Sequence, residues 1–385
     1  MLPPSAGRSR DVAGRLAVVQ SAPMSMTRAF IALWLGAVSL LAQPAPPAAP
    51  NPASTVLAND KLELTIGITG ARFSRLLIRG GEPLSPLATI GHFLALDGFG
   101  APSDEERAAG MPFHGEANHI SAKVIARQES GPVRSVSLQL WLPLAQETLT
   151  RTVEMADGES IVYVTSELES AIAVDRPVSW TEHATLGPPF LEPGKVTIDM
   201  PATRCRVRAY KAGSTGKLAY LKDFDWPMAP LTAGGFVNLL TVPVGETSLD
   251  LASCLMDPAR KYAYVTAVRT DKQLIFGYVF HREEYPWLMN WMNYTGDARA
   301  ARGIEFSTLP FDVSHRETVD AHEMFGAPTY KWLPAKSKIR TRFLFYYSPV
   351  PSGFTAVSDV LVEDGQVKIK DKSGKTVVLN ARLPL

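Results

Sequence analysis

Histidine is the side chain best suited to proton transfer near neutral pH, and this chain has seven of them. His114 lies in GMPFHGEANH, a polar segment flanked by Pro and Gly. We predict a loop there, and loops on rigid scaffolds often carry functional side chains. His183 lies in SWTEHATLGPPFLEPG. We predict that it directly follows a strand, in a segment that Gly187, Pro188 and Pro189 hold extended. The alternative for each histidine is a structural role, such as a hydrogen bond to nearby backbone.

Glu305 is the carboxylate whose surroundings best suit it to act with these histidines. It alternates with Ile304 and Phe306 in GIEFSTLPF, so it points to the face of the predicted strand opposite those two apolar residues. The alternative is an ordinary exposed strand carboxylate, which is less natural in a strand with so little charge.

Together, these three residues could open and close a cyclic hemiacetal. That reaction needs a base for the proton of the anomeric hydroxyl and an acid for the ring oxygen, and the roles reverse on closure. Glu305 suits the base, and His183, with an unperturbed pKa of about 6.5, suits the acid. His114 could hydrogen-bond the ring oxygen or an adjacent hydroxyl. We predict no metal and no cofactor, and the chain has no G-x-S-x-G motif for covalent catalysis.

Sugars also need a flat apolar surface for the CH face of the ring. The segment PWLMNWMNYTG supplies Trp287 and Trp291, and aromatic side chains there could form this platform. The alternative is that the two tryptophans, four residues apart, lie on a short helix and pack on the core. Glu116 and Glu182, close in sequence to the candidate histidines, are further candidates for binding substrate.

A metal site is the main alternative of a different kind. His114, Glu116 and His119 form the pattern H-x-E-x-x-H, and His315 and His322 could approach from later strands. Zinc or iron accepts such nitrogen and oxygen ligands. The spacing matches neither the helical HExxH pattern nor that of cupins, so we favour the acid–base interpretation.

Charge and cysteine content exclude several classes of protein. The 39 Lys and Arg residues against 38 Asp and Glu residues leave a net charge of +1. A nucleic-acid partner is therefore not expected, because phosphate contacts need a surplus of basic residues. Cys205 and Cys254 are too few for a disulfide framework and have no CxxC spacing. One structural disulfide between them remains possible.

The N-terminal part of the chain has the pattern of a targeting segment. From Met26 it reads MTRAFIALWLGAVSLLAQPAPPAAP, an apolar run that a Pro/Ala tract ends. We predict a signal peptide at about 26–42, with Met24 or Met26 as the start, and a linker to residue 50. The expectation is export to the periplasm or the medium, without stable membrane insertion after cleavage. The alternative, a retained anchor, is disfavoured because the run is shorter than the roughly 20 residues of a membrane span.

Apolar and polar residues alternate with a period of two through most of the remaining chain, which is the pattern of half-buried strands. Together with 30 prolines and 28 glycines, it predicts an all-β fold: one large antiparallel β-sandwich over 51–355. A terminal β-hairpin at 356–385 is packed on it or appended to it. The predicted strands are 61–68, 73–79, 121–128, 134–142, 147–155, 160–170, 195–200, 203–210, 262–270, 273–281, 303–311, 338–347, 365–371 and 375–383.

Four segments resemble the galactose mutarotase-like superfamily, which contains the aldose 1-epimerases. ELTIGITGARFSRLLIRGGEPLSPL resembles its opening hairpin, and PFHGEANH its HGG or HGE loop. WTEHATLGPPFL occupies the place of its N-H-x-Y-F-N-L segment, and GIEFSTLPFD resembles its late strand. The resemblance implies that His114 assists the reacting sugar, that His183 is the general acid and that Glu305 is the catalytic glutamate. The expected partner is a small sugar or the end of a glycan.

The chain departs from this superfamily in two places. The segment that carries arginine in the superfamily reads GHFLALDGFG (91–100), so an arginine expected to bind sugar hydroxyls is missing. For the superfamily's substrate-binding aspartate, Asp223 and Asp225 in LKDFDWP are the candidates. Two further functions follow from these departures and from the fold: a carbohydrate-binding protein without turnover, and an accessory domain of a polysaccharide lyase or glycoside hydrolase.

Overall fold

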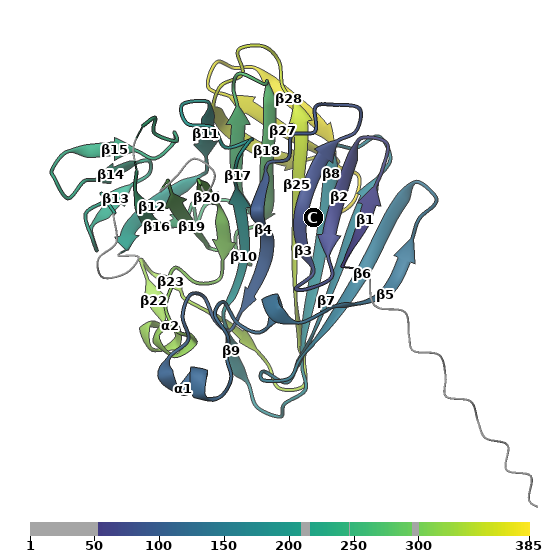
Figure 1. Cartoon of the computed structure of the whole chain (residues 1–385), viewed down its shortest axis with the longest axis vertical. Helices are drawn as coiled ribbons and strands as arrows, with labels where there is room; N and C mark the ends of the chain where they lie inside the picture. The colour runs from purple at the N-terminus through teal and green to yellow at the C-terminus, as the bar shows by residue number, and fades with distance from the viewer. Residues whose placement is uncertain (1–52, 209–215, 246, 295–299) are drawn as a thin grey trace, which may run out of the picture. The chain divides into compact units, whose positions relative to one another are not determined.

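The computed structural model describes residues 53–208, 216–245, 247–294 and 300–385. They belong to one unit that begins at residue 50. The predicted signal peptide and linker lie outside the described residues. Most of the unit is built from two large antiparallel sheets (Figure 1).

The first sheet has eleven strands among the described residues, and it carries both His183 and Glu305. In spatial order its strands are β1 (Ser54–Ala58), β2 (Leu62–Gly67), β3 (Arg72–Ile78), β4 (Leu87–Leu96), β10 (Trp180–Leu186), β20 (Ala301–Gly303), β19 (Trp287–Asn293), β16 (Leu249–Met256), β12 (Ala202–Arg208) and β13 (Asp223–Asp225), with β21 (Glu305–Ser307) bonded to both β10 and β19.

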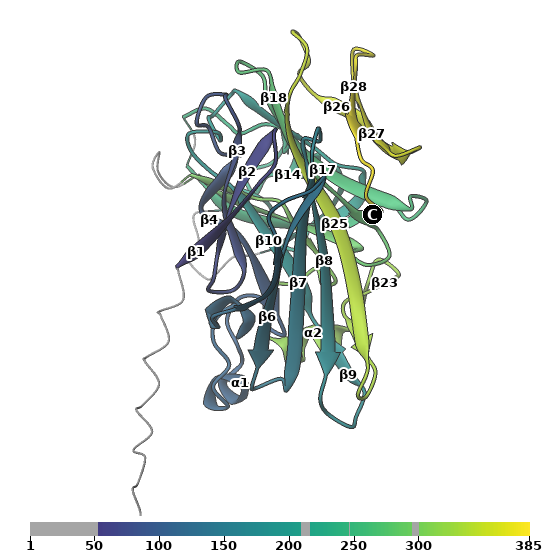
Figure 2. The same ribbon diagram turned by 90° about the vertical axis from the view of Figure 1, so that its right-hand side faces the viewer.

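The second sheet has eight strands in the described part of the chain, and Figure 2 shows the long ones side by side. In spatial order they are β11 (Val196–Asp199), β17 (Tyr262–Arg269), β18 (Leu274–His281), β25 (Lys338–Pro349), β8 (Ile161–Ser170), β7 (Glu147–Ala156), β6 (Val133–Leu142) and β5 (Lys123–Gln128).

The main hydrophobic core lies between these two sheets. Alternate residues of β2, such as Leu64 and Ile66, are fully buried, and so are Leu149 and Val153 of β7. These side chains from opposite sheets belong to one contiguous cluster. Burial of this apolar surface is the main term that stabilises the sandwich. The prediction of an all-β sandwich is confirmed.

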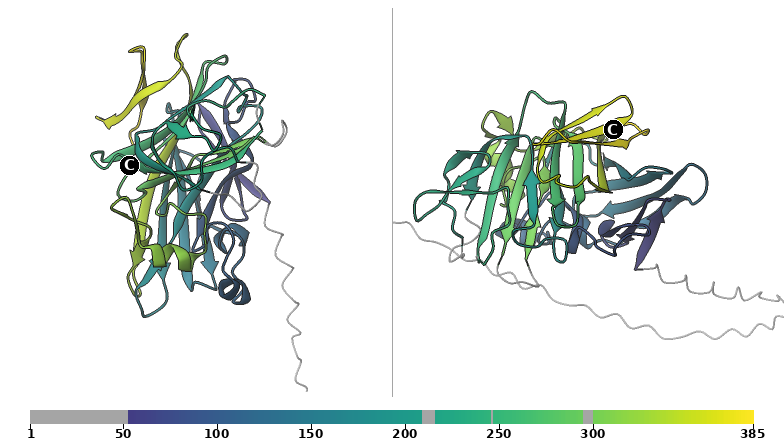
Figure 3. Two further views of the ribbon diagram at one scale, coloured as in Figure 1. Left: turned by 90° about the vertical axis from the view of Figure 1, so that its left-hand side faces the viewer. Right: turned by 90° about the horizontal axis from the view of Figure 1, so that it is seen from above.

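The C-terminal residues form a small sheet of their own, built from β26 (Val357–Glu363), β27 (Gln366–Asp371) and β28 (Thr376–Asn380). The sequence predicted a hairpin; β26 adds a third strand. Val360 and Ile369 of this sheet pack on Val279 and Leu344 of the second sheet in a separate apolar cluster. The C-terminal sheet therefore covers part of the outer face of the second sheet, over β17, β18, β25 and β8, and the view from above in Figure 3 shows it lying there.

Short elements connect the large sheets. Serine N-caps with capping boxes begin both α-helices found in the described part of the chain. None of the helices among the described residues has the length and apolarity to cross a membrane. The short elements are α1 (Asp104–Ala108), η1 (Ala117–His119), α2 (His315–Ala321), β9 (Arg176–Val178) paired with β24 (Lys331–Leu333), β14 (Met228–Pro230) paired with β15 (Phe236–Asn238), and β22 (Glu323–Met324) paired with β23 (Ala327–Pro328).

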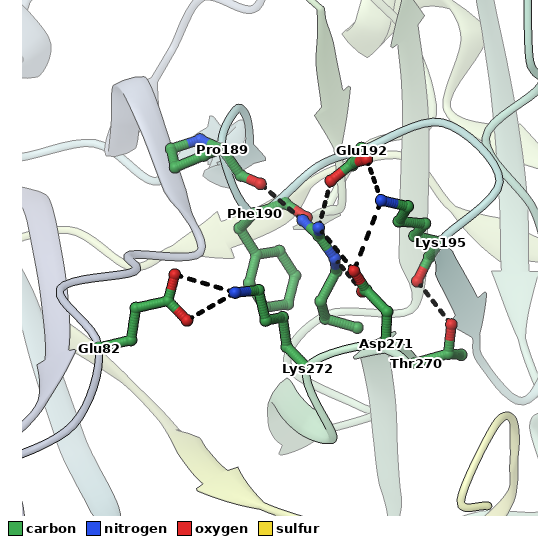
Figure 4. Close-up of polar contacts among 9 residues, drawn as sticks. Glu82, Pro189, Phe190, Glu192, Lys195, Thr270, Asp271 and Lys272 are labelled. Atoms are coloured by element: carbon green, nitrogen blue, oxygen red, sulfur yellow. Dashed lines mark hydrogen bonds and ion pairs between the residues drawn. The ribbon is translucent and has the colours of Figure 1, made fainter.

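Strand β10 is central to the first sheet, between β4 on one side and β20 and β21 on the other. All seven of its residues are buried, so His183 lies inside a strand and does not follow one as predicted. Arg269 of β17 fixes the segment after β10, because its guanidinium donates to the carbonyls of Pro189 and Phe190 at 2.6 and 2.8 Å and pairs with Glu192 and Asp271. Figure 4 shows this cluster.

Cys205 and Cys254 form a disulfide between β12 and β16. The two residues are direct cross-strand partners, and both side chains are fully buried. The bond closes a loop with a sequence separation of 49 residues. It therefore ties β12, which lies next to the edge strand β13, to its inner neighbour β16.

Candidate active site

The structure brings His114, His183 and Glu305 to one cavity of about 490 Å³. Successive residues of a strand point to opposite faces, and Glu182 contacts Arg151 of the second sheet. His183 therefore faces away from the core between the sheets. The cavity lies on this outer side of the first sheet. It is lined by Arg72, Ile90, Phe93, Phe99, Gly100, Ala101, Phe113, His114, Asn118, His183, Leu251, Trp291, Glu305 and Asp312.

His183 is held by its neighbours on β4 and β10. Its ring stacks on the ring of Phe93, its cross-strand partner, with centroids 4.1 Å apart and planes at 21°. Its Nδ1 lies 3.2 Å from the hydroxyl of Thr185, so Nε2 is the ring nitrogen left for other partners. Burial, followed by the nearby His114, lowers the pKa of His183 well below its usual value. The ring is therefore neutral in the ligand-free site.

Glu305 lies next to this ring, with its Oε1 at 3.3 Å from Nε2 of His183. Both carboxyl oxygens are buried and have no hydrogen-bond partner in the described part of the chain. Burial, followed by the charge of Asp312, raises the pKa of Glu305 well above its usual value. Burial thus favours an uncharged pair, in which Glu305 holds the acidic proton and His183 the free lone pair.

His114 stands over this pair, and its ring centroid is 5.3 Å from that of His183. Its backbone is left-handed, with φ of 64°, and its Nδ1 accepts a hydrogen bond from the N–H of Gly100 at 3.1 Å. Burial, followed by His119, lowers the pKa of His114 to about 4. A neutral ring that accepts at Nδ1 carries its proton on Nε2. His114 is therefore a hydrogen-bond donor at neutral pH.

Arg72 is a cavity residue that the sequence analysis missed. The sequence indicated that an arginine is missing from 91–100, and the structure supplies one from β3 instead. Its guanidinium donates to Oδ1 of Asn118 at 2.8 Å and lies 5.6 Å from the centroid of Phe93. The GA of the segment ELTIGITGARF precedes this arginine directly. That segment of the superfamily resemblance was the signal that could have pointed to it.

The two candidate tryptophans have different environments. Both lie on β19, which is a strand and not the short helix of the alternative interpretation. Trp291 lines the cavity. Trp287 is fully buried beside Phe311, and its indole N–H donates to the carbonyl of Pro328 at 2.8 Å. Trp287 is therefore a packing residue, and the aromatic wall of the cavity combines Trp291 with phenylalanines.

Glu182 points into the core and not into the cavity, in contrast to the sequence prediction. Its carboxylate bonds to Arg151 at 2.5 Å and to Nε2 of His92 at 2.7 Å. Burial alone would raise the pKa of Glu182, but Arg151 and His92 outweigh it and lower the pKa to about 2. Glu182 is therefore an ionised member of a buried network between the sheets.

Three other candidates also lie away from the cavity. The carboxylate of Glu116 accepts hydrogen bonds from the backbone N–H groups of Leu144 and Ala145 at 3.1 and 2.9 Å. Asp225 is exposed on the edge strand β13, and Asp223 of the same strand pairs with arginines. Neither aspartate lines the cavity. A substrate-binding role in this cavity is therefore not supported for these three residues.

The residues of the metal-site alternative do not converge either. Nε2 of His119 lies 2.9 Å from the carbonyl of Phe113, and His315 contacts the hydroxyl of Ser179 at 2.9 Å. His322 is exposed at the end of α2. Within the residues that the structure describes, no three His, Cys, Asp or Glu side chains are placed to hold one ion.

Comparison with protein-family models found no match, and neither did comparison with curated proteins. Solved structures, by contrast, include similar folds. The Slr1438 protein from Synechocystis sp. PCC 6803 is 14% identical, covers 77% of this chain and 96% of its own, and has a TM-score of 0.54. A proposed aldose 1-epimerase from Klebsiella pneumoniae is 14% identical, covers 76% and 79%, and has a TM-score of 0.55.

A third similar structure is a galactose mutarotase related enzyme from Lactobacillus acidophilus. It is 10% identical, covers 78% of this chain and 99% of its own, and has a TM-score of 0.54. The chain therefore has the galactose mutarotase-like β-sandwich fold, and the prediction of this fold is confirmed. At this level of identity the likeness shows the fold alone. Function has to be argued from the cavity.

Proposed function

We propose that this protein binds an aldose and interconverts its anomers by general acid–base catalysis. The observation that carries the proposal is the contact of His183 with Glu305 at 3.3 Å in a cavity that also holds His114. An uncharged carboxylic acid beside a neutral imidazole supplies one acid and one base at the same pH. The names of the similar structures from Klebsiella and Lactobacillus agree with this reaction.

The roles follow from the protons at each atom. Ring opening transfers the proton of the anomeric hydroxyl to the base and gives a proton from the acid to the ring oxygen. In the ligand-free site, His183 is the base and Glu305 the acid, which reverses the assignment made from the sequence. After rotation of the open aldehyde, closure returns both protons. His114 donates from Nε2 to an oxygen of the sugar and stabilises negative charge that develops on it.

Anomer exchange measured by NMR on a panel of aldoses tests the proposal. We expect exchange above the buffer background, and at least a 100-fold loss in both Glu305→Gln and His183→Ala. His281→Ala is the control, because His281 lies on β18 and does not line the cavity. Equal rates in wild type and both site variants would exclude the acid–base pair.

The second candidate function is sugar binding without turnover. Two observations favour it. Both carboxyl oxygens of Glu305 are buried in the ligand-free protein, and the walls of the cavity are largely aromatic and apolar. Saturable chemical-shift changes on addition of a sugar, with no acceleration of anomer exchange, would establish this function instead.

We further propose that the protein is exported. The segment at about 26–42, with its apolar run from Ala29 to Ala42, has the pattern of a signal peptide. The disulfide between Cys205 and Cys254 supports the same conclusion, because structural disulfides persist in oxidising compartments. Fractionation of cells and the intact mass of the protein test the proposal. A full-length chain that stays in the cytoplasm with reduced cysteines would contradict it.

A further inference from the structure

Asp312 is a second carboxylate in the cavity, and neither the sequence patterns nor the superfamily resemblance gave it a role. It follows Phe311 in the segment after β21 and lines the cavity together with His114, His183 and Glu305. Its side chain is 15% exposed. A carboxylate in such a position either belongs to a structural ion pair or is available to a ligand.

The ion pair that Asp312 forms with Arg208 is longer than expected for a largely buried carboxylate. Nη2 of Arg208, at the end of β12, lies 3.5 Å from Oδ1 of Asp312. This is longer than the roughly 2.7–2.9 Å of a charge-assisted hydrogen bond. The guanidinium itself lies 4.7 Å from the centroid of Phe311, which fixes its position beside the carboxylate. Arg208 therefore orients Asp312 but leaves acceptor capacity on its oxygens.

The backbone of Asp312 is also in contact with the loop that carries His114. Gly100 has a φ of 85°, and a Cβ there would lie 2.9 Å from the carbonyl oxygen of Asp312. The N–H of the same glycine donates to Nδ1 of His114. The position of Asp312 relative to the candidate catalytic residues is thus set by direct packing.

We propose that Asp312 is a further substrate-contacting residue of this site, whose carboxylate accepts hydrogen bonds from sugar hydroxyls, and that Arg208 is its positioning residue. This inference rests on the proposed function. Neighbouring hydroxyls of a sugar ring can donate to the two oxygens of one carboxylate. The sugars that fit are therefore those with free hydroxyls at the positions that Asp312 reaches, so Asp312 determines specificity.

The charges around Asp312 support this role. Burial raises the pKa of Asp312 to about 6 in spite of Arg208. The ionised carboxylate is thus poorly compensated in the ligand-free protein, and hydroxyl donors of a ligand would relieve that cost. Of the titratable groups around it, Arg208 on β12 pairs with Asp312 from outside the cavity lining and Glu305 on β21 interacts with its charge. The other titratable residues that line the cavity are His114, His183 and Arg72.

Kinetics and binding with deoxy sugars test the inference. For the best aldose, Asp312→Asn should lower kcat/KM by about 10- to 100-fold, mainly through KM, because a hydrogen bond to a charged group is lost. One monodeoxy analogue, which lacks the contacted hydroxyl, should react equally well with wild type and variant. Arg208→Met should also raise KM, and Arg208→Lys should restore part of the loss.

The control is a matched ion pair away from the cavity, Arg260 with Asp359 at 2.6 Å. Asp359→Asn should leave kcat and KM within twofold. If Asp312→Asn is as active as wild type on every sugar, or loses activity equally on all deoxy analogues, the inference is wrong and the proposed function stands. If wild type binds without turnover, the same comparisons are made on Kd. If wild type neither binds nor converts any sugar, the proposed function fails, and the inference with it.

Discussion

Gly303 offers a test of the site that changes no titratable group. It lies on β20, two residues before Glu305. A Cβ at this position would lie 2.1 Å from Oε1 of Glu305 and 2.9 Å from Cβ of Trp291. The absence of a side chain at Gly303 therefore makes room for the carboxyl group. Gly303→Ala should displace that group while leaving the chemistry of every cavity residue unaltered.

The size of the effect follows from these distances. Ordinary contact begins at 3.4 Å, so Oε1 must move by about 1.3 Å, away from its present position beside His183. A misplacement of about 1 Å can cost about 100-fold in rate. Overpacking of a buried site typically lowers the free energy of unfolding by about 1–3 kcal/mol. We expect both effects in Gly303→Ala.

The assay combines anomer exchange by NMR with urea denaturation. Gly67→Ala is the matched control, because it also adds a methyl group to a strand glycine of the first sheet, but its nearest neighbour would be at 3.7 Å. A Gly303→Ala protein with the rate and unfolding midpoint of Gly67→Ala would refute the argument. It would mean that the carboxyl group of Glu305 is not held at this place, or that its place does not matter for the reaction.

Three other perturbations have defined outcomes. Phe93→Leu removes the ring stacked on His183. It should lower the anomer-exchange rate about tenfold and the free energy of unfolding by only about 1 kcal/mol. An unchanged rate would contradict the role of Phe93 in holding His183 in place. Replacing both Cys205 and Cys254 by Ala should lower the unfolding free energy by about 4 kcal/mol in urea titrations, since the disulfide closes a 49-residue loop. The pKa of His114 is about 4 in the folded protein and about 6.5 in the unfolded chain. The contribution of His114 to the free energy of unfolding is therefore fully present above pH 6.5. It falls by up to about 3 kcal/mol as the pH is lowered towards 4. Asn tolerates the positive φ at this position, and His114→Asn should lack this loss of unfolding free energy between pH 7 and pH 4 in urea titrations. An equal loss in wild type and variant would contradict the lowered pKa of His114.

Several of the strands that the sequence predicted have one polar face. In β2 and β7, buried and less buried residues alternate along the strand, so the period of two is visible in the sequence. The central strands β10, β16 and β19 were not predicted, and nearly all of their residues are buried. The equally buried β17 and β18 were predicted, so burial makes a strand harder to find without hiding it. A strand covered on both faces loses the alternation and reads as a short apolar run.

The candidate catalytic residues could be predicted because their sequence neighbours are unusual, whereas their partners could not. Asp312 and Arg72 lie in two of the segments that resemble the superfamily, but neither received a role there, and they meet the site only through the pairing of β3, β4, β10 and β21. Conversely, Glu182 and Asp225 were predicted to bind substrate because of their residue type, but they do not line the cavity. Strand alternation turns the first into the core, and the order of the sheet puts the second at its edge.

Strand β10 shows why fold and site are difficult to separate in this protein. Glu182 on its inner face is fixed by Arg151 and His92 between the sheets, and the next residue, His183, enters the cavity on the outer face. The buried ion pair limits how far the strand can shift, because any movement would separate charges in a region of low dielectric. The same rigidity fixes the imidazole against Glu305. The proposed catalytic pair needs a defined contact distance, and one of its members is thus built on a strand that a buried network holds in place.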